Sequence, residues 1–265
     1  MTTVALDIDR MLDSLDRMAS QRPVAARIVA TINKESSGAA ELAGVLGADV
    51  ALAAKVMKLA NSAYFGLSGK VTSLQFAVTV VGFNTVRSIA TVALSGVDTA
   101  NALPTGFWKT SMHLAAASGT LGQQFRVRTA DAMCVGLLAQ LGTALLHQAD
   151  PQGYERVVLT TDLGAERFAA ESCRYGLCGP QLTAEALQQW RFPADMVEAL
   201  RAVQSGTEGA LVRTAYELTA RLVHPGHRYI SLERLSGNRI AESQAVAKMA
   251  AIRADVQELR NALGL

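Results

Sequence analysis

The residues best suited to chemistry are few and lie far apart. The four histidines are His113, His147, His224 and His227, and only the last two are neighbours in the sequence. A catalytic metal ion generally needs about three imidazole or carboxylate ligands and one open position. His224 and His227 belong to a Pro-Gly turn, whereas His113 and His147 fall in separate helical segments. We therefore expect structural roles for all four, and no metal ion or other cofactor.

Carboxylate chemistry is also weakly indicated. Asp131, Asp150 and Glu155 could be imagined as an acid and a base. Carboxylates beside helix ends, however, usually act as caps and solvated charges. The segment 164–166 is not a phosphate-binding loop, and no GxSxG or GxGxxG motif follows a strand. The residues alone thus predict a protein without catalysis.

The composition indicates a globular, all-α protein. Of the 265 residues, 50% are hydrophobic and only 5% are aromatic, which suits close helix packing better than a β-sandwich. Charged residues make up 18%, the formal net charge is +2, and basic residues are scattered. Without a basic patch, nucleic acid is not an expected partner.

Several segments bear on the compartment. Residues 1–10 contain no apolar stretch of signal-peptide length, and the uncharged run 132–149 is interrupted by polar residues and glycines, which favours a buried helix over a membrane span. Cys134 lies in this run, and Cys173 and Cys178 do not form a CxxC pair. Few and unpaired cysteines are typical of reduced thiols. We expect a cytoplasmic protein without membrane attachment.

Apolar residues recur at helical spacing along almost the whole chain. Asp49 and Ser73 are expected N-caps, and Gly66 is placed to end a helix. The expected helices cover about 7–18, a segment from 23, 38–46, 49–64, segments after 73 and 84, 107–125, 131–147, 151–161, 165–175, 181–190, 194–203, 211–223 and 241–263.

A stretch of small and polar residues at 95–106 divides these helices into two sets. We expect an N-terminal helical subdomain at 1–100, a second helical subdomain at 101–225 and a tail with a terminal helix at 226–265. The last helix carries an apolar seam of barely two heptads, which either packs on its own domain or joins a homodimer or a partner helix. The seam residues are Met249, Ile252, Val256, Leu259 and Leu263.

One long string of residues is specific enough to indicate a family. Residues 49–66 read DVALAAKVMKLANSAYFG, and VTSL at 71–74, AV at 77–78, Gly82 and VRSIA at 86–90 follow in order. This pattern closely resembles the HDOD family, a bacterial output domain related to the HD and HD-GYP metallophosphohydrolases. The resemblance implies an all-α fold of two subdomains, the second a degenerate HD-like bundle, and a role in signal transduction.

The resemblance continues more weakly through FWKTS at 107–111, GLLAQLG at 136–142 and WRFPADMVEALR at 190–201. It implies that Thr110 stands where an HD enzyme has its first histidine. Ala139 and Gln140 then stand in place of the His-Asp pair, and residues 203–204 are Val-Gln where two histidines often occur. Such side chains are absent or poor ligands for a hydrolytic metal. We expect a pseudoenzyme.

The central motif, LANSAYFG at 59–66, has two interpretations. Asn61 could bond backbone groups at a helix end while Tyr64 and Phe65 fill a seam between the halves. Alternatively, these three residues and Arg87 could form a recognition surface for a protein or a small anion.

Three functions remain open. The first, which we favour, is a regulatory adaptor that binds signalling proteins, of unknown identity, through its helical surface. The second is an HD-type phosphohydrolase, and the third is a pseudoenzyme that senses a nucleotide in its emptied pocket. Metal content separates the second from the others, and ligand-dependent stabilisation separates the third from the first.

Overall fold

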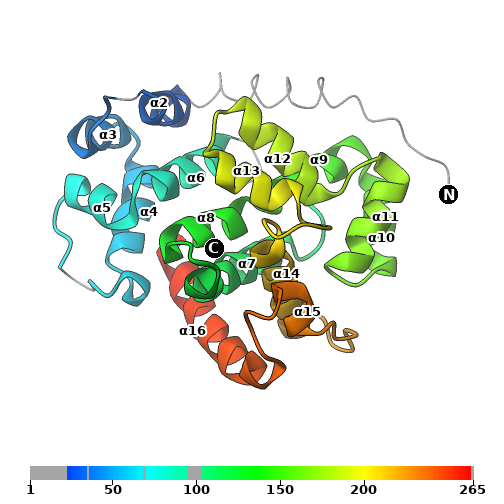
Figure 1. Ribbon diagram of the computed structural model, residues 1–265. Coiled ribbons are helices and arrows are strands. Elements are labelled where there is room, and N and C mark those ends of the chain that lie inside the picture. The colour runs from blue at the N-terminus through cyan, green and yellow to red at the C-terminus, as the bar shows by residue number, and fades with distance from the viewer. Residues whose placement is uncertain (1–22, 35, 68–69, 95–102, 264–265) are drawn as a thin grey trace. The chain divides into compact units, whose positions relative to one another are not determined.

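The computed structural model describes residues 23–34, 36–67, 70–94 and 103–263 (Figure 1). All regular elements in these ranges are helices, and no strand occurs among them. The prediction of an all-α fold is therefore confirmed. The helix expected at 7–18 and the boundary expected after residue 100 lie outside the described residues.

The described residues belong to two compact units. The N-terminal unit contains residues 23–94 and 254–263. In it, α2 packs on α3 and α6, and α5 packs on α3 and α4. Its core includes Ile28, Leu42, Val56, Leu59 and Val78. The helices are α2 (Pro23–Ile32), α3 (Ala39–Leu46), α4 (Val50–Ala60), the short 3-10 helix η1 (Ala63–Phe65), α5 (Leu74–Val81) and α6 (Phe83–Leu94).

The C-terminal unit contains residues 103–253. Its central helix α7 packs on α8 and α14, while α12 packs on α9 and α13. The helices are α7 (Phe107–Leu121), α8 (Thr129–Leu138), α9 (Leu141–Ala149), α10 (Pro151–Thr160), α11 (Ala165–Tyr175), α12 (Gly179–Gln189), α13 (Ala194–Arg201), α14 (Ala210–Val223) and α15 (Leu232–Ser236), with the 3-10 helices η2 (Gly122–Phe125) and η3 (Glu242–Gln244). The last helix, α16 (Ala245–Leu263), is divided between the units after Arg253.

Local signals in the sequence fix several helix starts. The Asp49 carboxylate accepts a hydrogen bond from the Leu52 N–H at 3.0 Å, and the Ser73 hydroxyl accepts one from the Phe76 N–H at 3.2 Å. Both side chains act as N-caps, as predicted. The helix expected at 49–64 is shorter, however, because α4 ends at Ala60 and a separate 3-10 turn follows.

The single helix predicted at 131–147 is wrong. The chain forms α8 and α9 instead, interrupted at Ala139 and Gln140. The Gly142 N–H donates to the Thr183 hydroxyl at 2.8 Å, and a Cβ on Gly142 would lie 2.0 Å from the Gly179 carbonyl oxygen. Such close backbone contact with α12 is a tertiary constraint, which helical periodicity does not report.

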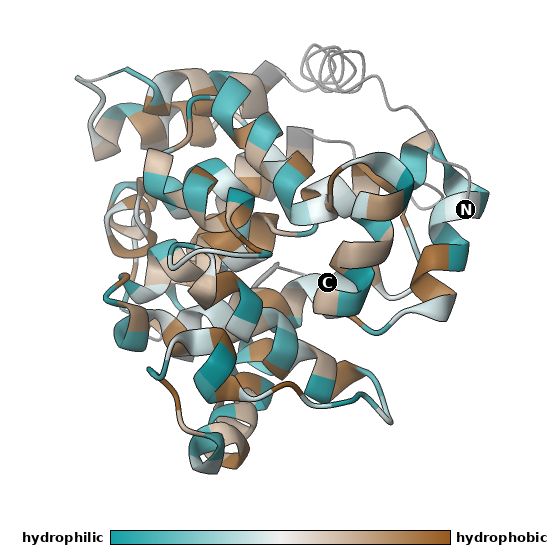
Figure 2. Ribbon diagram, turned by 45° about the vertical axis from the view of Figure 1, so that its right-hand side comes forward, coloured by the Kyte–Doolittle hydropathy of each residue, from teal (hydrophilic) through white to brown (hydrophobic). Residues whose placement is uncertain are grey.

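Most helices carry both hydrophobic and hydrophilic residues (Figure 2). Among the described residues, the segment Thr129–Ala149 is long and apolar enough to cross a membrane, and 83% of its apolar window is buried. The bent pair Leu74–Val81 and Phe83–Ala93 meets the same test if counted as one span. Length and composition alone do not distinguish a span from a core helix.

Candidate functional site

The three residues that the resemblance places at the HD ligand positions are buried in the C-terminal unit. Thr110 lies on α7, and Ala139 and Gln140 connect α8 to α9. The Gln140 side-chain amide donates a hydrogen bond to the Tyr216 hydroxyl at 3.0 Å, and this hydroxyl donates to the Ala139 carbonyl at 3.2 Å. Tyr216 of α14, a residue that no motif singled out, therefore binds both Ala139 and Gln140, which the resemblance places at the His-Asp pair.

A cavity of about 350 Å³ lies beside these positions. Phe168 connects the cavity to these positions. Its ring lines the cavity and also packs edge-on against the Tyr216 ring, with the ring centroids 4.8 Å apart. Val203 and Gln204, which the resemblance places where two histidines often occur, also line it. The full lining is Gly164, Ala165, Phe168, Val203, Gln204, Ser205, Arg213, Glu217, Ile230, Arg234 and Leu235.

A second, larger cavity of about 700 Å³ shares Ala165 and Ile230 with the first. Its wall is mainly polar and includes Asp162, His227 and Arg228. The two cavities are therefore neighbours around the segment 226–230.

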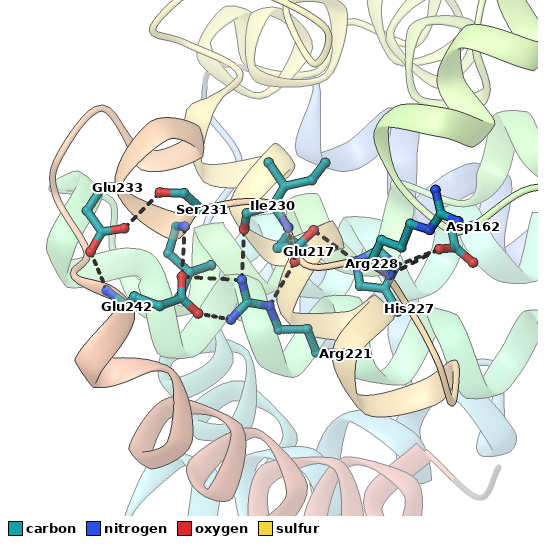
Figure 3. A network of polar contacts seen from close by, with 10 residues as sticks. Asp162, Glu217, Arg221, His227, Arg228, Ile230, Ser231, Glu233 and Glu242 are labelled. Carbon is teal, nitrogen blue, oxygen red and sulfur yellow. Dashed lines mark hydrogen bonds and ion pairs between the residues drawn. The ribbon is translucent and has the colours of Figure 1, made fainter.

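A network of ion pairs holds this segment in place (Figure 3). The buried His227 ring lies between two carboxylates, with Nδ1 3.2 Å from Asp162 Oδ2 and Nε2 3.0 Å from Glu217 Oε2. A carboxylate only accepts hydrogen bonds, so both contacts are satisfied together only when both ring nitrogens carry protons. The two carboxylates therefore hold the His227 ring through both of its nitrogens.

Glu217 is the centre of the network. Its Oε1 accepts hydrogen bonds from Arg221 Nε at 2.8 Å and from the Ile230 N–H at 3.0 Å. Arg221 also donates to the Ile230 carbonyl and pairs with Glu242. Burial disfavours the Arg221 cation, but hydrogen bonds to Glu242 and Glu217 outweigh burial and raise its pKa. The network thus fastens residues 226–242 to α14.

A second buried polar group lies between α10 and α11. The Tyr154 hydroxyl donates to Glu171 Oε1 at 2.5 Å, and the Gly179 N–H donates to Glu171 Oε2 at 2.7 Å. Burial raises the pKa of both Glu171 and Tyr154. Glu171 lines neither of the two cavities, and its hydrogen bonds join α10, α11 and α12.

Two of the other histidines contact neighbouring residues of the fold. His113 Nδ1 lies 2.7 Å from the Lys109 carbonyl, and His147 Nε2 lies 4.0 Å from a Glu155 oxygen. Burial lowers the pKa of His224. Within the described ranges, no three His, Cys, Asp or Glu side chains are grouped so that they could hold a metal ion.

The carboxylates for which an acid or base role was weakly indicated, Asp131, Asp150 and Glu155, line neither cavity. Asp150 caps α10 by accepting the Gly153 N–H at 3.0 Å, and Asp131 pairs with Arg128 at 2.6 Å. Both therefore act as helix-end charges. Cys134 and Cys178 are buried, and burial raises the pKa of Cys178 to about 12.

The central motif belongs to the N-terminal unit. Asn61 bridges two backbone segments, since its side-chain amide donates to Val71 O at 2.8 Å and its oxygen accepts the Val71 N–H at 2.9 Å. The Tyr64 and Phe65 rings pack edge-on, with centroids 5.2 Å apart. Arg87 is only 4% exposed, and burial lowers its pKa to about 10. Arg87 thus adds little to any surface, and a recognition role for this cluster stays a prediction.

The seam of the last helix is largely covered within one chain. Ile252, Val256 and Leu259 are buried, and Met249 is half-buried. The side chain of Leu263 lies outside the described residues. Burial favours the alternative in which the seam packs on its own chain, and the use of the seam by a partner stays a prediction.

Comparison with known proteins matches residues 18–205 to the HDOD domain. A candidate phosphohydrolase from Shewanella amazonensis SB2B has a similar structure, with a TM-score of 0.70 and 20% identity over 96% of this chain and 97% of that chain. An HDOD domain protein of unknown function from Geobacter sulfurreducens is also similar in structure, with a TM-score of 0.61. It is 19% identical, and the match covers 96% of this chain and 99% of that chain.

An uncharacterized protein from Treponema pallidum (strain Nichols) is 23% identical over 210 residues, or 76% of this chain. The match covers 39% of that relative's own length. The likeness to the two solved structures shows the fold of the chain.

Proposed function

Since the chain belongs to the HDOD family, we propose that it is a non-catalytic regulatory protein of bacterial signal transduction that acts by binding other proteins. The observation that carries this proposal is the Tyr216 contact. Where the family resemblance expects a metal-binding His-Asp pair, Gln140 and Ala139 are buried and hydrogen-bonded to a phenol. An amide and a methyl group supply no anionic or imidazole ligand for a hydrolytic metal.

The position of the amide strengthens this reading. A catalytic metal site keeps one coordination position open to water or substrate. The Gln140 side chain is 4% exposed and points to Tyr216, whose ring is covered by Phe168. A metal at this position would have to displace a closed hydrogen bond between buried groups, which is costly.

The test is elemental analysis of the full chain purified without chelator, together with hydrolysis of a generic phosphodiester by the same sample. We expect well under one equivalent of iron, manganese or zinc, and no turnover above that of buffer. One or two bound ions per chain with metal-dependent turnover would overturn the proposal and favour an HD-type phosphohydrolase.

A further inference from the structure

Two guanidinium groups line the 350 Å³ cavity without a carboxylate partner. Arg213 comes from α14 and Arg234 from α15. Among the described residues, no carboxylate forms an ion pair with either of them. Two cations at one cavity repel each other unless an anion lies between or beside them.

Arg213 is held in a fixed orientation by neutral groups. Its Nη1 donates to the Ala202 carbonyl at 3.0 Å, and its Nη2 donates to the Gly206 carbonyl at 2.7 Å. Carbonyl dipoles orient a guanidinium but do not cancel its charge. Burial correspondingly lowers the pKa of Arg213, as expected for a cation without a counter-ion.

Glu217 is the acidic residue in the lining, and its charge is already matched elsewhere. Its Oε1 accepts from Arg221 and from the Ile230 N–H, and its Oε2 contacts the His227 ring. Each oxygen therefore faces the ion-pair network. The charge presented by Arg213 and Arg234 is not compensated by Glu217.

The remaining wall is mostly apolar. Phe168 and Val203 are buried, and Ile230 and Leu235 are half-buried, while Ser205 supplies a hydroxyl group. A pocket with an apolar wall and a few charged donors favours a ligand with an apolar body and one charged end. Guanidinium groups bind phosphate and carboxylate especially well, because their N–H groups match two oxygens at once.

We propose that this cavity binds a small organic anion, whose phosphate or carboxylate group pairs with Arg213 and Arg234 and whose apolar part packs on Phe168, Val203 and Leu235. The site goes beyond the proposed function, since such a ligand can occupy the cavity whether or not a protein partner is bound. The cavity volume lies near the lower end of the range for small-molecule pockets, which begins at about 300 Å³. The ligand must therefore be a small molecule.

The probe is phenyl phosphate, titrated into the full chain by calorimetry, with phenol as its uncharged counterpart. We expect phenyl phosphate to bind and phenol to bind at least about 10-fold more weakly, because phenol lacks the charge-assisted hydrogen bonds. Arg234→Gln should weaken phenyl phosphate binding by about 10-fold or more. Arg228→Gln is the matched control, since this exposed arginine lines the other cavity, and it should leave binding unchanged.

Arg213→Lys keeps the charge but loses the planar fork, and it is a second test if Arg234→Gln fails to fold. It should weaken phenyl phosphate binding while phenol binding stays the same. Absence of binding at millimolar phenyl phosphate, or equal binding by the wild type and both variants, would overturn the site. Release of inorganic phosphate from phenyl phosphate would instead overturn the non-catalytic function and leave the binding site standing.

Discussion

Asp150 shows how a single side chain joins local and tertiary structure. It caps α10 through the Gly153 N–H and also pairs with Arg174 of α11 at 2.7 Å and with the Tyr175 hydroxyl at 3.1 Å. Burial alone would raise its pKa, but the hydrogen bonds from Arg174, Gly153 and Tyr175 outweigh burial and lower it. The charged carboxylate is therefore stabilised in the folded state.

We predict that Asp150→Asn lowers the free energy of unfolding by about 1 kcal/mol at neutral pH, because asparagine can still cap α10 but loses the ion pair with Arg174. A carboxylate with a lowered folded pKa stabilises the fold at pH values above its unfolded pKa of about 3.9, and this contribution is lost as the pH falls. The difference between wild type and variant should thus shrink in acid. Urea unfolding at pH 7 and at pH 3 measures it.

Asp195→Asn is the control, because Asp195 is exposed in the first turn of α13. This variant should leave the urea midpoint nearly unchanged at both pH values. If the loss of unfolding free energy in Asp150→Asn increased at low pH, this result would contradict the lowered pKa of Asp150.

Glu217 is predicted to be the costliest charge to remove. In Glu217→Gln the buried Arg221 and His227 would lose a shared anion, and breaking a buried ion pair typically costs about 3–5 kcal/mol. Urea unfolding should show a loss of this order, and Glu217→Gln combined with Arg221→Gln should cost less than the sum of the two. The exposed Glu208 is the matched control, and Glu208→Gln should leave the unfolding midpoint unchanged. Strict additivity would contradict the network.

The packing of α9 on α12 depends on a glycine at their contact. Gly142→Ala would place a Cβ 2.0 Å from the Gly179 carbonyl oxygen, which forces α9 away from α12. We expect a loss of about 3 kcal/mol or more in the free energy of unfolding, as for severe overpacking.

Gly44 supplies the opposite expectation. It is exposed within α3, and a Cβ there would meet no atom within 4 Å. Gly44→Ala should stabilise the chain by about 0.5–1 kcal/mol, because alanine favours the helix over glycine. Parallel urea unfolding of the two variants compares them directly. Equal effects would show that the close contact of α9 and α12 is not present in solution.

The state of association is a question about the whole molecule. Three seam residues of α16 are buried within one chain, and Ile252 is 0% exposed. We predict that Ile252→Ala lowers the free energy of unfolding by about 2–4 kcal/mol, as for a large-to-small change in a core. Light scattering should give the 28.0 kDa of one chain before and after the substitution.

Val246→Ala is its control, because Val246 lies on the same helix and is 75% exposed. It should alter neither stability nor mass. A wild-type mass of two chains that falls to one in Ile252→Ala would support the alternative in which the seam joins a homodimer.

The sequence by itself determined the helical class, the family and most helix ends. The string at 49–66 is long enough to indicate the HDOD family, and Asp49, Ser73 and Pro23 mark helix starts where the structure has them. These features are local, because caps and periodicity depend on residues within one or two turns. The resemblance also predicts that Ala139 and Gln140 stand in place of the His-Asp pair of HD enzymes.

Only the tertiary structure decided what fills those positions and where charges meet. Gln140 and Tyr216 are 76 residues apart in the chain, and His227 and Asp162 are 65 apart. Glu217 and Arg221 have the spacing of a helical ion pair, but nothing local indicates that they are buried or that His227 joins them. Such contacts depend on how helices distant in sequence pack together, because side-chain partners are selected by shape and burial over the whole fold.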